Sequence, residues 1–436
     1  MRQYTLSIEE PRLFDHLCTT NVLAYAFKEV RKNKGAPGVD GVTVKDFETN
    51  LNKELDQLKM ELENWDYKPK PVRRVDIPKP TGGIRLLGVP CIRDRIVQTG
   101  IKLLLEPILE RQFSENSFGF RPNRNQRQAI EQAQNIVQSG KPYVVDIDLS
   151  KFFDRINHDR LISQLGQYIS DKRMLRLIGM TLRSGIMKEE TFIPSTEGAT
   201  QGSPLSPLLS NLVLDNLDKE LEKRGLEFCR FADDCNIFAG SQKAAERIMQ
   251  NVCKFITEKL KLVVNTEKSQ VALSDQVKFL GMTIVNGTIA ISRKAIDHAM
   301  NKVKELTPRG TSHKVTETVN KINTWYVGWS SYFSMTQYPA QLKKIEAHIR
   351  RRLRSRLVSQ QKRRRHLYNK LVKRGVKPSL ARSAVYSNRG RWALSRTRAV
   401  EQGYPNRWFE IELGFKARSN DKLSHWFDVK KWVHLT

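Results

Sequence analysis

The sequence has few cysteines, and no pair of them is spaced to bind a metal. Its 436 residues include only five cysteines, and none belongs to a Cys-x-x-Cys motif. They are scattered along the chain as Cys18, Cys91, Cys229, Cys235 and Cys253. This pattern argues against a disulfide framework and against a zinc site. We expect these residues to be small core side chains of a protein in a reducing compartment.

Long apolar segments are also lacking. The chain has no run of 18 or more apolar residues and no lipidation signal, and its amino terminus lacks the charged-then-apolar order of a secretion signal. We therefore expect a soluble, cytoplasmic protein with no membrane partner.

Acidic residues are scarce relative to basic ones. The chain carries 75 Lys and Arg against 46 Asp and Glu, a formal net charge of +29. Residues 291–436 account for +24 of this excess and residues 1–290 for only +5. A polyanion is the natural partner for such a charge. The first two-thirds of the chain is typical of a packed catalytic body, and the last third of a binding extension.

Two adjacent carboxylates, Asp233 and Asp234, lie between short apolar arms in residues 228–238. Neighbouring side chains on a straight strand point to opposite faces, so an Asp pair that converges on one object belongs at a turn. Mg²⁺ prefers carboxylate oxygens together with substrate phosphates. The pattern therefore predicts a hairpin with a metal-binding tip, which needs a further ligand from elsewhere.

Residues 143–149 offer that ligand. They alternate strictly between apolar and polar, which predicts a strand with aliphatic side chains on one face and Asp146 and Asp148 on the other. A half-buried strand with a solvated acidic face explains this segment equally well when it is considered alone.

Three blocks in order resemble the palm of a reverse transcriptase, most closely of the group II intron type. They are VDIDLSKFFD at 145–154, TQGSPLSP at 200–207 and FADD at 231–234. The resemblance implies that Asp148 and Asp233 are the principal ligands of two Mg²⁺ ions and that Asp234 is the third acid. The family usually has Tyr where this chain has Phe231. We expect this change to have a small effect on template–primer contact.

A second group of residues is implied to bind the incoming nucleotide. Lys79 and Arg85 flank a Pro-Thr-Gly-Gly turn in a predicted hairpin, and the family keeps a Lys and an Arg at these places against the triphosphate. Two exposed basic residues on a hairpin are the plain alternative. Phe153 aligns with the residue that packs below the sugar and excludes a 2′-hydroxyl group.

Gln201 and Gly202 complete the expected nucleotide-binding set. Glycine adopts backbone angles closed to other residues, so Gly202 would let a base pair approach the main chain. An ordinary loop entering a helix has the same composition, and this alternative stays open.

Nucleic-acid-binding residues are expected in two places. Arg121 lies in a segment rich in aromatic and guanidinium groups that resembles the second conserved block of the family. Residues 341–400 carry 20 Lys and Arg and one acid, a density excessive for solubility alone, although a charge run is usually a solvated face. The candidates there are Arg350, Arg351, Arg352, Arg354, Lys362, Arg363, Arg364 and Arg365.

The expected fold class is α+β. It is a right-hand polymerase with fingers, a palm built on an antiparallel sheet, a helical thumb and a basic helical C-terminal domain. We expect fingers and palm in residues 1–288, the thumb or maturase X region in 289–345 and the basic domain in 346–436. No Cys/His endonuclease module follows, so we expect an endonuclease-lacking type that does not cut the second strand of its target.

The resemblance implies an RNA-directed DNA polymerase that also binds its intron RNA as a splicing maturase and supports retrohoming by target-primed reverse transcription. Its partners would be structured intron RNA, target DNA, an RNA template with a DNA primer, and deoxynucleotides, and it would associate with the nucleoid when bound to DNA. One alternative is a free-standing group II-like reverse transcriptase adopted for DNA repair or phage defence. A catalytically silent RNA-binding scaffold is disfavoured, because all three acids are present.

Overall fold

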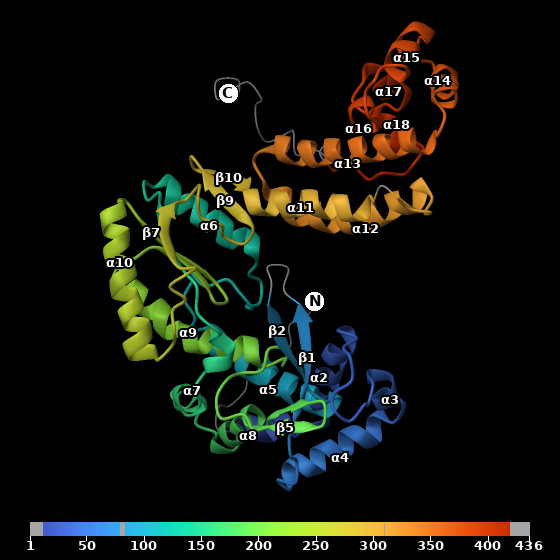
Figure 1. Ribbon diagram of the computed structural model, residues 1–436. Helices are drawn as coiled ribbons and strands as arrows, with labels where there is room; N and C mark the ends of the chain where they lie inside the picture. The colour runs from blue at the N-terminus through green and yellow to red at the C-terminus, as the bar shows by residue number, and fades with distance from the viewer. Residues whose placement is uncertain (1–11, 79–82, 309, 419–436) are drawn as a thin grey trace. The chain divides into compact units, whose positions relative to one another are not determined.

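The structure is a computed structural model that describes residues 12–78, 83–308 and 310–418. Lys79, one of the two expected triphosphate ligands, lies outside the described residues. The chain forms two compact units, Met1–Leu273 and Ser274–Thr436 (Figure 1).

The first unit contains helices and short strands in alternation. Its helices are α1 (Leu13–Leu17), α2 (Thr20–Lys32), α3 (Val44–Thr49), α4 (Leu51–Glu63), α5 (Ile92–Glu110), α6 (Gln126–Gln138), η2 (Phe152–Arg155), α7 (His158–Leu165), α8 (Lys172–Leu182), α9 (Ser206–Lys223), α10 (Gln242–Phe255) and η3 (Ile256–Leu260). Its strands are β1 (Val72–Pro78), β2 (Ile84–Val89), β3 (Tyr143–Ile147), β4 (Ile186–Lys188), β5 (Thr191–Ile193), β6 (Phe228–Phe231), β7 (Asp234–Ala239) and β8 (Gln270–Leu273).

A four-stranded antiparallel sheet carries the predicted acidic strands. Its order is β6-β7-β3-β8, so β3 lies between β7 and β8. Helix α10 packs against β3, β7 and β8, and α6 packs against β6 (Figure 1). Val145 and Ile147 on β3 are buried, as the two-residue period predicts. The buried aliphatic face therefore fixes which face of β3 carries Asp146.

The second sheet of this unit has the order β2-β1-β4-β5. Strands β1 and β2 form the antiparallel hairpin that the sequence predicts, and β1 continues the sheet by pairing in parallel with β4. A short antiparallel pairing of β4 with β5 ends the sheet.

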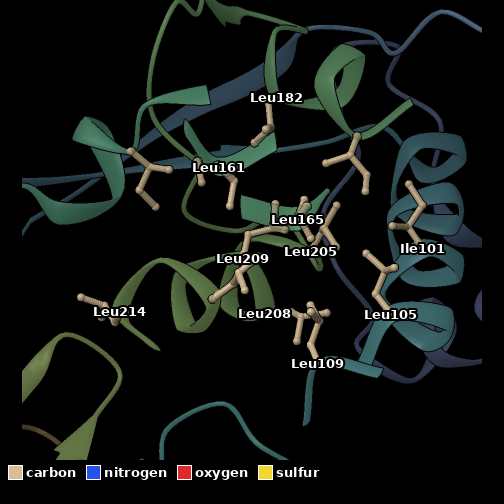
Figure 2. Close-up of a cluster of buried hydrophobic side chains, with 14 of the residues drawn as sticks. Ile101, Leu105, Leu109, Leu161, Leu165, Leu182, Leu205, Leu208, Leu209 and Leu214 are labelled. Atoms are coloured by element: carbon tan, nitrogen blue, oxygen red, sulfur yellow. The ribbon is translucent and has the colours of Figure 1, made fainter. Parts of the chain in front are cut away.

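The core of the first unit is rich in leucine. Figure 2 shows part of it, where side chains from α5, α7, α8 and α9 meet. The labelled residues are Ile101, Leu105, Leu109, Leu161, Leu165, Leu182, Leu205, Leu208, Leu209 and Leu214. Burial of such side chains removes apolar area from water and is the main favourable term in folding. It fixes the position of α9, the helix that comes directly before the acidic hairpin in the chain.

The second unit is a small hairpin followed by helices. The hairpin pairs β9 (Met282–Val285) with β10 (Thr288–Ile291). The helices are α11 (Arg293–Leu306), α12 (Val315–Tyr332), η4 (Phe333–Met335), α13 (Pro339–Gln360), α14 (Arg364–Lys373), α15 (Pro378–Val385), α16 (Arg391–Leu394), α17 (Arg398–Gly403) and α18 (Asn406–Ile411).

The second unit has one core where the sequence suggests two domains. Helix α13 runs without interruption across residues 345 and 346, the expected boundary between thumb and basic domain. Buried residues on both sides of it, such as Val319 and Phe409, belong to one hydrophobic cluster. The residues of the expected thumb and basic domain thus share a single core, and the division between the two stays a prediction.

Two further expectations concern cysteines and membranes. All five cysteines are free thiols; four of them are buried and Cys253 is half-buried, as expected for small core residues. In the described part of the chain, no helix combines the length and the apolar character needed to cross a membrane.

Candidate active site

The antiparallel register brings the predicted aspartates to one end of the sheet. Ile147 of β3 lies opposite Cys235 of β7, so the next residues along the two strands are Asp148 and Asp234. Phe231 pairs with Asp234 across the β6–β7 hairpin, which leaves Ala232 and Asp233 as a two-residue turn. The predicted hairpin with an acidic tip is present in the structure.

The turn is unusual in its backbone. Ala232 has a φ of 57°, in the left-handed region that a residue with a Cβ rarely adopts. This conformation costs roughly 1–2 kcal/mol relative to a right-handed one. Surrounding contacts must therefore hold the turn in place.

Asp148 and Asp233 interact electrostatically. Asp233 is half-buried, and burial is the main cause that raises the pKa of its carboxyl group above the ordinary value. The negative charge of Asp148 raises the pKa further, while a backbone hydrogen bond and the charges of Arg85 and Arg230 lower it. A bound cation would offset the unfavourable ionisation of Asp233, so this carboxyl group suits a metal ligand.

The main chain of Asp148 is fixed by a segment just before β8. Its N–H donates to the hydroxyl of Ser269 at 3.0 Å, and its carbonyl accepts from the N–H of Asn265 at 2.8 Å. Sequence analysis did not assign Ser269 to the site. Its position is set by the pairing of β3 with β8, which a single sequence does not reveal.

In the described residues, no group of three or more His, Cys, Asp or Glu side chains is arranged so that it could already hold a metal ion. Asp148 and Asp233 are the residues that could hold one, with Asp234 beside them at the start of β7. The side chain of Asp234 is exposed.

Phe153 lies next to the loop that carries Gln201. The carbonyl of Phe153 accepts a hydrogen bond from the N–H of Ala199 at 2.7 Å, and the carbonyl of Ile156 accepts one from Gly198 at 2.8 Å. Phe153 is half-buried, and its ring meets the buried Phe152 edge-on at 5.3 Å. The structure therefore brings the expected sugar-contacting residue and the 198–202 loop together.

The same loop contacts the β1–β2 hairpin. The N–H of Gly88 on β2 donates to the carbonyl of Gln201 at 2.8 Å. Gly202 has a φ of +113°, and a Cβ atom there would lie 2.5 Å from the carbonyl oxygen of Gly88. The need for glycine at position 202 is thus explained by contact with β2, where the sequence interpretation invoked the approach of a base pair.

Arg85 is exposed on β2 opposite Ile77. Its charge acts on Asp233, so the structure brings this expected phosphate ligand within electrostatic reach of the acidic turn. A cleft of about 690 Å³ lies beside β2 and is lined by α2, α5, Gly202 and Pro204 as well.

Arg121 is a structural residue in this fold. Its guanidinium is buried, forms an ion pair with Glu110 at 2.8 Å, and donates to the carbonyls of Ser114 and Ser117. It therefore closes the loop between α5 and α6, and these internal contacts do not support the expectation that it binds nucleic acid, which stays a prediction. The aromatic and guanidinium composition of this segment reflects internal packing, including the approach of Arg121 to the ring of Phe113.

The arginines of α13 are likewise used inside the second unit. Arg354 is buried and donates to the carbonyl of Tyr404 at 2.9 Å and to the Asn406 side chain at 2.7 Å. Arg352 bonds the hydroxyl and the carbonyl of Thr307, and Arg351 stacks on Trp392 with its guanidinium carbon 3.8 Å from the ring centre.

Arg350 completes this internal set. It is buried and forms an ion pair with Glu346 at 3.5 Å. The run from Arg350 to Arg354 therefore makes contacts that join α13 to the helices around it, while Arg351 and Arg352 stay partly exposed. Its contact with nucleic acid stays a prediction.

The second basic run is different, because Lys362, Arg363, Arg364 and Arg365 are all exposed. They lie at the junction of α13 and α14, and no carboxylate occurs in the sequence between Glu346 and Glu401. Of the nine residues expected to bind nucleic acid, these four retain a surface position suited to phosphate contact.

Residues 77–284 match the family described as reverse transcriptase (RNA-dependent DNA polymerase), and residues 296–375 match the group II intron, maturase-specific domain. The first match covers most of the first unit and extends into the second as far as residue 284, and the second match lies within the second unit.

Three relatives give the extent of the similarity. Protein YkfC of Escherichia coli is 32% identical over 64% of this chain and 84% of its own length. The group II intron-encoded protein LtrA of Lactococcus lactis is 31% identical over 61% of this chain and 43% of its own length. A putative COX1/OXI3 intron 2 protein of Saccharomyces cerevisiae is 34% identical over 58% of this chain and 29% of its own length. The chain thus spans most of the first relative and less than half of the other two.

These findings confirm the resemblance, the α+β polymerase fold and the expected enzyme class. The family generally uses divalent metal ions, and the two matched domains imply binding of RNA and DNA. The chain belongs to the reverse transcriptase (RNA-dependent DNA polymerase) family, as a member with a group II intron maturase-specific domain.

Proposed function

We propose that this chain extends a DNA primer on an RNA template at the site formed by Asp148, Asp233 and Asp234. The observation that carries the proposal is the interaction of Asp148, at the end of β3, with Asp233 in the β6–β7 turn. Two carboxylates from different strands, held against their mutual repulsion, suit phosphoryl transfer better than a structural role.

The reaction forms one phosphate ester bond and breaks one phosphoanhydride bond. The primer 3′-oxygen attacks the α-phosphorus of a deoxynucleotide, and the bond from that phosphorus to the bridging oxygen breaks, releasing pyrophosphate. When bound by the three aspartates, two Mg²⁺ ions would supply positive charge at the attacking and leaving oxygens. The aspartates themselves fix where that charge is held.

The remaining residues bind and select the nucleotide. Arg85, which acts electrostatically on Asp233, would contact the triphosphate. Lys79, which lies outside the described residues, would add a second charge. Phe153, beside the 198–202 loop, would form the wall below the sugar and disfavour a 2′-hydroxyl group.

We further propose that the second unit binds the structured RNA of an intron and supports its splicing and its insertion into target DNA. The support is the maturase-specific match over residues 296–375 and the exposed run from Lys362 to Arg365. Neutralisation of phosphates by such residues releases counterions and gives salt-dependent affinity.

The test of polymerisation is extension of a DNA primer annealed to RNA by the purified full chain with deoxynucleotides and Mg²⁺. Product that depends on template, metal and chain supports the proposal, and its absence with either Mg²⁺ or Mn²⁺ contradicts it. Sequencing of RNA that co-purifies with the chain tests the second proposal. A single structured RNA supports the maturase role, whereas a random sample of cellular RNA argues for a free-standing enzyme.

A further inference from the structure

A fully buried arginine lies directly behind the acidic turn. Arg230 is the residue before Phe231 on β6, and its side chain has 0% exposure. Its Nε and Nη2 atoms donate to the two carboxylate oxygens of Asp218 at 2.7 and 2.6 Å, a bidentate arrangement. Asp218 lies on α9 and is also fully buried.

The remaining nitrogen of the guanidinium reaches the turn itself. Nη1 donates to the carbonyl oxygen of Ala232 at 2.8 Å and to the side-chain oxygen of Asn211 at 3.0 Å. The Ala232 carbonyl belongs to the peptide group that joins Ala232 to Asp233. Arg230 therefore connects α9 to the main chain immediately before the catalytic carboxylate.

Gly119 also lies close to the turn. A Cβ atom on Gly119 would lie 2.2 Å from the backbone nitrogen of Ala232, so only glycine permits this approach. The carbonyl of Gly119 accepts a hydrogen bond from the Asn211 side chain at 2.8 Å. Asn211 thus binds both the arginine and the loop that presses on the turn.

Stability alone is a poor explanation for this arrangement. A buried ion pair loses so much hydration that apolar residues of similar volume often stabilise a fold equally well or better. The contact that apolar residues could not replace is the hydrogen bond to the Ala232 carbonyl. That bond holds a turn whose left-handed Ala232 is otherwise unfavourable.

We propose that Arg230 is a positioning residue for DNA synthesis, which fixes the peptide between Ala232 and Asp233 and thereby the location of the Asp233 carboxylate. Asp218 and Asn211 anchor it to α9, and the close approach of Gly119 further restricts the turn. The inference rests on the proposed function, because it assigns Asp233 to the reaction. Misplacement of a reacting group by about 1 Å can cost about 100-fold in rate.

The test uses two variants of the full chain that disturb the turn in different ways. Arg230→Lys keeps the positive charge but loses the fork that bonds Asp218 and Ala232 together. Gly119→Ala leaves Arg230 unchanged and pushes a methyl group toward the Ala232 nitrogen. Tyr67→Phe is the control, since it removes a buried 2.6 Å hydrogen bond to Asp94 in the same unit without touching the turn.

Each protein is assayed well below its melting temperature for single-nucleotide incorporation. We expect Arg230→Lys and Gly119→Ala to lower the maximal rate about tenfold or more while the nucleotide Kd stays within about threefold. Titration of the free proteins with Mn²⁺, followed by electron paramagnetic resonance, should show weaker binding in both variants. Tyr67→Phe should lower the melting temperature about as much as the other two variants do. Its rate and its Mn²⁺ affinity should nevertheless match those of the wild type.

The results separate the two proposals. If the wild type does not extend a primer, the proposed function fails, and the Mn²⁺ titration still decides whether Arg230 positions Asp233. If the wild type is active and both variants lose no more rate than Tyr67→Phe, Arg230 is structural only. Should Arg230→Lys not fold, Gly119→Ala decides the question by the same criteria.

Discussion

The backbone N–H of Gly88 donates a hydrogen bond of 2.8 Å to the carbonyl of Gln201, which ties the β1–β2 hairpin to the loop beside Phe153. The two chain segments approach so closely there that neither Gly88 nor Gly202 has room for a Cβ atom. The hairpin bearing Arg85 and the loop bearing Gln201 therefore form one surface, and its integrity depends on two glycines.

Gly202→Ala should destabilise the first unit by roughly 2–4 kcal/mol, because it combines an unfavourable φ with overlap against the Gly88 carbonyl. Gly225→Ala is the matched control, since Gly225 also has a positive φ but nothing within 4 Å of its Cβ position. It should cost about 1–2 kcal/mol. Urea unfolding measures both. The two variants could instead lose the same free energy of unfolding while only Gly202→Ala loses nucleotide affinity. That result would support the approach of a base pair at Gly202.

Phe153→Val should increase the use of ribonucleotides by roughly tenfold or more relative to deoxynucleotides, because the wall below the sugar is removed. The neighbouring Phe152→Val is the control. Phe152 is buried and should lose stability without changing sugar preference. Competitive incorporation of paired ribo- and deoxynucleotides provides the ratio, and an unchanged ratio in a folded Phe153→Val protein would make Phe153 a packing residue only.

Asp94 should make the stability of the first unit depend on pH. Burial raises the pKa of its carboxyl group to about 6, although Tyr67 and the Lys70 N–H donate hydrogen bonds to it. An unfolded Asp titrates near 3.9. Because the pKa of Asp94 is higher in the folded state, its protonated form stabilises the fold. This contribution to the free energy of unfolding is complete below about pH 4 and is lost as the pH rises through about 6.

When the pH is raised from 5 to 7.5, the free energy of unfolding of the wild type should therefore fall by about 1.4 kcal/mol relative to that of Asp94→Asn, because Asn cannot ionise. Denaturant unfolding of both proteins at the two pH values measures the difference. A wild-type-to-variant gap that stays constant over this range would show that Asp94 does not titrate there.

The exposed and the buried arginines of the second unit should behave differently. Replacing Lys362, Arg363, Arg364 and Arg365 by Gln should weaken RNA binding and flatten the dependence of log affinity on log salt by about 0.7–0.9 for each phosphate that is no longer neutralised. Thermal stability should change little, because these side chains are exposed.

Arg354→Gln is the matched control for this measurement. It should lower the melting temperature, because the Tyr404 carbonyl and the Asn406 side chain lose their buried partner, and it should leave the salt slope unchanged. Equal salt slopes in the four-residue variant and the wild type would mean that the 362–365 run only solubilises the chain.

The acidic residues of the site could be predicted because their signals are local. The alternation around Asp148 requires a strand, and the adjacent Asp233 and Asp234 between apolar arms require a turn. The register that places Asp148 at the level of Asp234, and the support from Ser269, could not be predicted in this way. These depend on pairing between segments far apart in the chain.

The contacts of the basic residues of α13 could not be predicted from local signals. A run such as Arg350 to Arg354 predicts a charged surface only if its side chains find no acceptors inside the protein. Here the Tyr404 carbonyl and Asn406 accept from Arg354, and Trp392 stacks on Arg351. Sequence composition contains no information on such distant partners, so the internal contacts of these arginines could not be predicted. The same helix joins the expected thumb to the basic region in one core.

The clearest signal that sequence analysis passed over is polarity at core positions. Asn211 and Asp218 lie seven residues apart on one face of α9, among buried leucines. A buried Asn and a buried Asp need hydrogen-bond partners, and Arg230 donates to both.

RNA-templated primer extension by Asp233→Asn tests the central claim most directly. The change removes one carboxylate charge at the turn and almost no volume, so we expect activity to fall about 1000-fold or more while RNA affinity stays within a few-fold. Asp159→Asn, which alters an exposed carboxylate paired with Arg183, should retain activity within about twofold. An Asp233→Asn protein that extends the primer at a substantial fraction of the wild-type rate would contradict the assignment of this turn as the catalytic site.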